Sequence, residues 1–238
     1  MSGWTAKRFW KEARAEAVEG GYTVYLDGRP IGSPAKRPLL LPTRAMAEAV
    51  AAEWAAVAEV VDPGAMPVTR SANAAIDKVA PQFDEVACLI AAYGGSDLLC
   101  YRAKGPEALV RAQAEAWDPL LDWAARSYGA PLVTTVGVLP VDQPPESLAR
   151  LAAPLHAASA FELTALHDLV SLTGSLVLGL AATSGAFEPE AIWRLSRIDE
   201  DWQAAQWGED EEAMIAAARK RGDFLHARHF WEVSAPRP

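Results

Sequence analysis

Hydrophobic positions near the N-terminus occur in short runs of the kind that form strands. Residues 22–26 are rich in β-branched and aromatic side chains, which favour strands. The Asp27-Gly28 pair that follows is a preferred two-residue hairpin turn, so a return strand is expected after it. Residues 39–41, three consecutive leucines before a proline, predict a third short strand. The N-terminal part of the chain is therefore expected to be rich in β-structure.

From residue 43 onward the spacing of apolar residues becomes helical. Thr43 is a typical N-cap, and Met46, Val50, Trp54 and Val57 follow it on one face, which is expected to cover the short strands. The pattern predicts an α+β protein, with a small β-rich domain at residues 1–100 and a larger helical domain at residues 101–238. Further helices are expected at about residues 71–79, 81–93, 107–128, 144–158 and 162–182, from residue 188, and at 211–229.

Residues 191–212 combine aromatic side chains with uncompensated negative charge. They contain three of the nine tryptophans, and residues 199–212 hold seven carboxylates without a lysine or arginine. Tryptophan often anchors protein interfaces, where charge selects the partner, so a partner-binding site is predicted here. The alternative is that the tryptophans are core residues and the acids a solvated face. The predicted site residues are Asp199, Glu200, Asp201, Trp202, Trp207 and Trp193.

The spacing within this stretch also predicts its local structure. Ile192, Leu195, Asp199 and Trp202 are three or four residues apart, which places them on one face of a single helix. The glycine that follows Trp207 is expected to end that helix, because glycine is the favoured residue after a helix C-terminus.

Composition and charge narrow the possible partners and the compartment. The 238 residues carry a net charge of −9, which argues against nucleic acid or an anionic membrane as the main partner. Cys88 and Cys100 fit no metal or redox spacing and are expected to be buried free thiols in a reducing compartment. The first residues lack the apolar segment of a secretory signal, and no apolar run is long enough to span a membrane. We expect a cytoplasmic protein.

The sequence carries few signs of catalysis. It contains no nucleophile elbow, phosphate loop or dinucleotide-binding motif. His226 and His229 have helical spacing but too few companions for a metal site, so neither a metal nor a cofactor is expected. The alternative to a binding protein is a small-molecule enzyme or ligand-binding domain with a pocket between the two domains. It would use His167, Asp168 and the acids at 199–201.

Seven blocks of the chain occur in collinear order between Lys7 and Glu212: KRFWKEA, YTVYLDGRPIGSPAKRPLLLPT, AAEW, MPVTRSANAAIDKV, DLLCYR, SLVLGLA and DEDWQAAQWGEDEE. Together they resemble a known family, the assembly chaperones of the F-type ATP synthase that act on the alpha subunit. The short N-terminal lead resembles the bacterial branch of the family.

The resemblance implies a chaperone without enzymatic activity. Members of the family bind the free alpha subunit and shield the surface that beta subunits later cover. The family fold pairs a small β-rich N-terminal domain with a helical C-terminal domain. The family also carries a functionally important acid before its Trp-Gly pair, in the segment that Asp199, Glu200 and Asp201 occupy here, where Asp rather than Glu stands first. The expected partner is the alpha subunit, and the free protein is expected to be a monomer.

Overall fold

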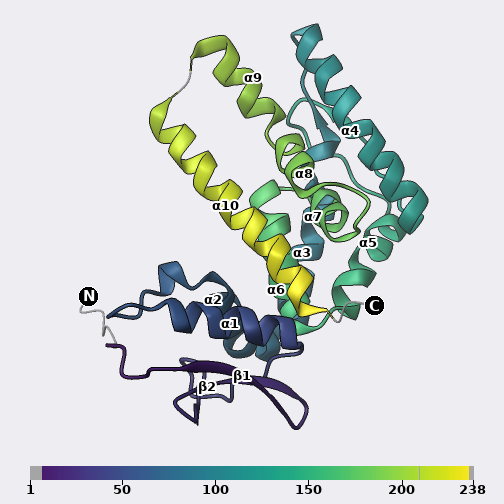
Figure 1. Ribbon diagram of the computed structural model, residues 1–238. Helices are drawn as coiled ribbons and strands as arrows, with labels where there is room; N and C mark the ends of the chain where they lie inside the picture. Colours follow the sequence, from purple (N-terminus) through teal and green to yellow (C-terminus); the bar gives the residue numbers. More distant parts are fainter. Residues whose placement is uncertain (1–6, 209, 236–238) are drawn as a thin grey trace. The chain divides into compact units, whose positions relative to one another are not determined.

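The chain divides into two compact units, each assembled from segments that are not contiguous in sequence. The computed structural model describes residues 7–208 and 210–235 (Figure 1). The first unit takes in the chain up to Phe83, together with Ser159–Ala165 and the chain from His229. The second unit consists of Asp84–Ala158 and Leu166–Arg228. The domain boundary expected near residue 100 stays a prediction.

The first unit contains an antiparallel sheet with the strand order β1-β2-β3. β1 spans Ala13–Val18, β2 spans Gly21–Leu26 and β3 spans Arg29–Pro30. Asp27 and Gly28 join β2 to β3 with positive φ values of 48° and 80°, as a tight hairpin turn requires. The predicted hairpin is therefore confirmed. The third strand predicted at residues 39–41 is wrong, because Leu41 forms only an isolated bridge to Tyr22.

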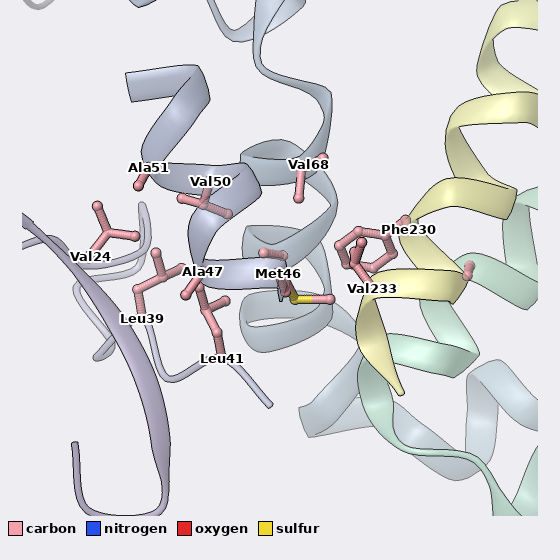
Figure 2. Close-up of a cluster of buried hydrophobic side chains, with 12 residues drawn as sticks. Val24, Leu39, Leu41, Met46, Ala47, Val50, Ala51, Val68, Phe230 and Val233 are labelled. Atoms are coloured by element: carbon pink, nitrogen blue, oxygen red, sulfur yellow. The ribbon is translucent and has the colours of Figure 1, made fainter. Parts of the chain in front are cut away.

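One helix, α1 (Arg44–Ala56), covers this sheet. Thr43 is its N-cap, and the Thr43 side chain accepts a hydrogen bond from the Met46 amide, as predicted. Figure 2 shows the apolar face of α1 between the strands and the C-terminal helix, with Met46 at its centre and Phe230 opposite. The buried members of this cluster are Val24, Leu39, Leu41, Met46, Ala47, Val50, Ala51, Val68, Ala72, Ala165, Phe230 and Val233.

Trp54 belongs to the core of the first unit. Its ring packs edge-on against Trp10, with 5.1 Å between the ring centroids. The Trp10 indole also donates a hydrogen bond to the Trp54 carbonyl, at 3.2 Å. Trp54 contacts both the main cluster and a smaller one formed by Trp10, Leu26, Val57 and Met66. The half-buried Trp54 ring thus packs beside the strands, on the helical face that the sequence predicts to cover them.

Helices make up most of the remaining chain, which confirms the predicted α+β class. The helices between α1 and residue 100 are η1 (Pro63–Ala65), α2 (Pro67–Ala74), η2 (Ala75–Val79), η3 (Ala80–Gln82), α3 (Phe83–Ala91), η4 (Ala92–Ser96) and η5 (Leu98–Cys100). Two short strands, β4 (Tyr101–Arg102) and β5 (Thr135–Val136), pair in parallel. The later helices are α4 (Glu107–Tyr128), α5 (Pro145–Ala157), α6 (Ala160–Thr173), α7 (Leu176–Thr183), α8 (Pro189–Leu195), α9 (Ile198–Trp207) and α10 (Glu211–Ser234).

The centre of the second unit is organised by the buried carboxylate of Asp97. This residue is fully buried and accepts hydrogen bonds from the Ser175 hydroxyl at 2.7 Å and from the Leu99 and Val177 amides at 3.0 Å. Burial raises the pKa of the Asp97 carboxyl, and the hydrogen bonds oppose that rise. Ser175 is itself the N-cap of α7, so Asp97 fixes the start of a helix that is buried on all sides.

Helices α6 and α7 approach each other closely at Gly179. A Cβ added at Gly179 would come within 2.4 Å of the Val170 side chain. The small residue therefore lets α7 pack directly on α6, as glycine often does where two helices meet closely.

The two cysteines have different environments. Cys100 is buried, and burial, assisted by the Asp97 carboxylate, raises the pKa of its thiol to about 12. Cys88 is exposed, which corrects the prediction that both are buried. Cys88 lies on the outer side of α3, where its neighbour Leu89 is exposed as well.

Candidate partner-binding site

The stretch predicted to be one helix is two, and this changes which side chains share a face. α8 ends at Leu195 and α9 begins at Ile198, so Ile192 and Asp199 do not lie on a common helical face. The single-helix prediction is wrong. Ser196 contributes to the break, because its hydroxyl bonds back to the Trp193 carbonyl at 2.7 Å.

A second cause of the break comes from a distant helix. In a continuous helix the Leu195 carbonyl would accept from the Asp199 amide, four residues on. Here it accepts from the indole nitrogen of Trp117, at 2.8 Å. Trp117 is fully buried and lies on α4, a helix that continues without a break through Pro119. The Arg102 guanidinium lies 5.4 Å from the centroid of the Trp117 ring. A contact 78 residues away in sequence therefore sets where α9 begins.

The Asp199 carboxylate is bonded to another helix of the second unit. The Gln113 amide donates to its carboxylate at 2.6 Å, and the other side of the same amide accepts from the Ala103 backbone at 2.8 Å. Gln113 is 2% exposed and lies on α4. Asp199 thus joins α9 to α4, and its carboxylate is partly engaged in the fold.

Glu200 and Asp201 differ in how far their charge is compensated. Arg197 donates to the Glu200 carboxylate at 2.8 Å, an ion pair near the surface. Asp201 is exposed, and within the described part of the chain its carboxylate has no hydrogen-bond or ion-pair partner. Both acids lie in the first turn of α9, where the helix dipole favours negative charge. Of the three predicted acids, Asp201 has the most freely available charge.

The three predicted tryptophans occupy different environments. Trp193 is 5% exposed and packs against Phe224, so its ring is part of the core. Trp202 is half-buried. Trp207 is 80% exposed at the end of α9, an unusual position for the largest apolar side chain. The structure therefore brings Trp207 and Asp201 to the surface together, and leaves Trp193 inside.

The helix after Trp207 adds apolar surface that the sequence analysis missed. Gly208 has a φ of +96° and ends α9 as predicted. Glu209 lies outside the described residues, and Asp210 then accepts from the Glu212 amide at the start of α10. Met214 and Ile215, in the following turn, are 46% and 64% exposed. The signal that could have found it is the run from Ala213 to Ala218, which has no polar residue on any side of the helix.

The residues considered for catalysis show no assembled site. His167 and Asp168, neighbours on α6, bond to each other at 2.9 Å, and this hydrogen bond raises the pKa of the imidazole. Among the described residues, no three or more His, Cys, Asp or Glu side chains are grouped so that they could hold a metal ion. The helices described are also too short or too polar to cross a membrane.

The fold and the site define a class: an α+β protein that presents an exposed tryptophan and an uncompensated acid on one helix, as protein-binding proteins do. Residues 7–125 match the family described as ATP12 chaperone protein. The chain belongs to this family of chaperones.

The solved structures that are similar cover almost the whole chain. Atp12 from Paracoccus denitrificans is 55% identical, covers 97% of this chain and 99% of its own, and superposes with a TM-score of 0.94. A putative chaperone from Agrobacterium tumefaciens is 45% identical, with 96% and 86% coverage and a TM-score of 0.92. Mitochondrial atp12 of Schizosaccharomyces pombe is 25% identical, over 87% of this chain and 75% of its own. These similarities confirm the predicted family and its bacterial branch.

Proposed function

We propose that this chaperone binds the free alpha subunit of the F-type ATP synthase. It shields the surface that beta subunits cover in the assembled catalytic head, and it is released when they bind. The chaperone is cytoplasmic, a monomer when free, and needs no cofactor for this task. Its membership of the ATP12 chaperone family supports the proposal.

The observation that carries the proposal is that α9 exposes both Trp207 and Asp201. A tryptophan that is 80% exposed can anchor an interface by burying a large apolar area when a partner covers it. An acid without a partner in the described chain can pair with a basic group of the alpha subunit. Glu200 and Trp202 stand on either side of Asp201 in the sequence, while the Asp199 carboxylate accepts from Gln113 and the Trp193 ring packs inside against Phe224.

Replacing Asp201 by lysine should weaken binding of the alpha subunit by about 2 kcal/mol, roughly 30-fold, because the charge that meets the partner is reversed. The melting temperature should stay near that of the wild type, since the side chain is exposed. The measurement is the dissociation constant for purified alpha subunit, taken beside a thermal unfolding curve.

The matched control is Asp142→Lys, which changes the net charge equally at an exposed position far along the chain, before α5. This control should bind like the wild type. Equal binding by wild type, Asp201→Lys and Asp142→Lys would show that the acid only solvates the surface.

A further inference from the structure

Two helices of the second unit enclose an open groove beside Trp207. α9 and the first turns of α10 form a helical hairpin, drawn in light and yellow green in Figure 1. The groove between them has a volume of about 430 Å³. Its apolar lining consists of Trp207 with Met214 and three alanines, Ala204, Ala213 and Ala217.

The groove is suited to a side chain of another protein. Small residues on facing positions leave a depression that a larger side chain can fill, and Trp207 and Met214 supply adaptable apolar walls. Asp210 is exposed, and so are residues 211–216 and 218–222 of α10, so nothing in the described chain covers this face.

Charge on the rim selects the kind of segment that fits. Glu200, Asp201 and Asp210 line the groove with Arg197, which gives a net charge of −2. Arg197 is already paired with Glu200, so the charges left for a partner are both negative. The hollow on another face of α10 is balanced, with Glu212 and Asp223 against Arg219 and Lys220.

We propose that the groove between α9 and α10 receives one large apolar side chain of the alpha subunit from a segment that carries lysine or arginine beside it. The apolar side chain packs between Trp207 and Met214, and the basic group meets Asp201 and Asp210. This inference rests on the proposed function and specifies where and how the alpha subunit binds.

Met214 and Ile215 provide a matched pair of variants. They are consecutive, apolar and exposed, but only Met214 lines the groove, whereas Ile215 lies on the other face of α10. Met214→Glu should weaken binding of purified alpha subunit at least about tenfold, because it places a charge against the incoming apolar side chain. Ile215→Glu should change the affinity less than about threefold, since it adds the same charge outside the contact.

The outcomes separate this inference from the function it rests on. No binding by the wild type contradicts the proposed function itself. If the wild type binds and both variants bind as tightly as it does, or both lose the same affinity, the proposed function stands and the proposed role of the groove is wrong. Unfolding curves of both variants should match the wild type, because neither side chain is buried.

A crosslinking experiment identifies the occupant. Gln203 lines the groove from α9 and can be replaced by the photoreactive residue p-benzoylphenylalanine. Irradiation of its complex with alpha subunit should attach one peptide that contains a large apolar residue next to lysine or arginine. Attachment of an acidic peptide, or no attachment from a complex that forms, would contradict the proposed occupant.

Discussion

Replacing Asp97 by alanine should lower the free energy of unfolding by about 3–5 kcal/mol, one of the two largest effects that we expect from a single substitution. Three buried donors lose their acceptor at once: the Ser175 hydroxyl and the amides of Leu99 and Val177. Each unsatisfied buried donor costs about 1–3 kcal/mol, and partial rearrangement reduces the sum. Denaturant unfolding, with the slope compared between variants, measures the loss.

The control for this substitution is Asp142→Ala, which removes the same group from an exposed position. It should change the free energy of unfolding by no more than about 0.5 kcal/mol. If Asp97→Ala unfolds at the same denaturant concentration as Asp142→Ala, the carboxylate does not organise the second unit.

Trp117→Ala should cost about 3–5 kcal/mol of stability, because the side chain is fully buried and its removal leaves a cavity. The variant also loses the hydrogen bond to the Leu195 carbonyl, which separates α8 from α9. The matched control is Trp207→Ala, in which the same side chain is removed from the surface.

The two tryptophan variants should have opposite profiles. Trp207→Ala should keep the melting temperature of the wild type and weaken binding of the alpha subunit, while Trp117→Ala should unfold at a lower temperature. Thermal unfolding and binding measured on the same samples make the comparison. A large loss of stability in Trp207→Ala would show that the Trp207 ring stabilises the fold and is not reserved for partner binding.

Local chemistry explains which elements could be predicted from the sequence. The Asp27-Gly28 turn and the Thr43 cap depend on residues next to each other in the chain, and both form as expected. Strand β1 was not predicted, because its sequence ARAEAV holds residues of low strand preference. That strand forms because six of its residues pair with β2.

Long-range contacts explain the remaining errors. The break between α8 and α9 depends on Trp117, whose indole takes the carbonyl that would continue the helix. The aromatic residues of the acidic stretch could be recognised from the sequence, but not their environments, because Phe224 on another helix buries Trp193 while no described element covers Trp207. The groove was also unpredictable, since it requires α9 and α10 to fold back beside each other.

The most direct test of the central claim is aggregation of purified alpha subunit, followed by light scattering with and without this chaperone. The proposed function predicts that an equimolar amount suppresses aggregation, and that added beta subunit then displaces the chaperone from the complex on gel filtration. Aggregation at the same rate in its presence, with no complex on the column, would contradict the claim.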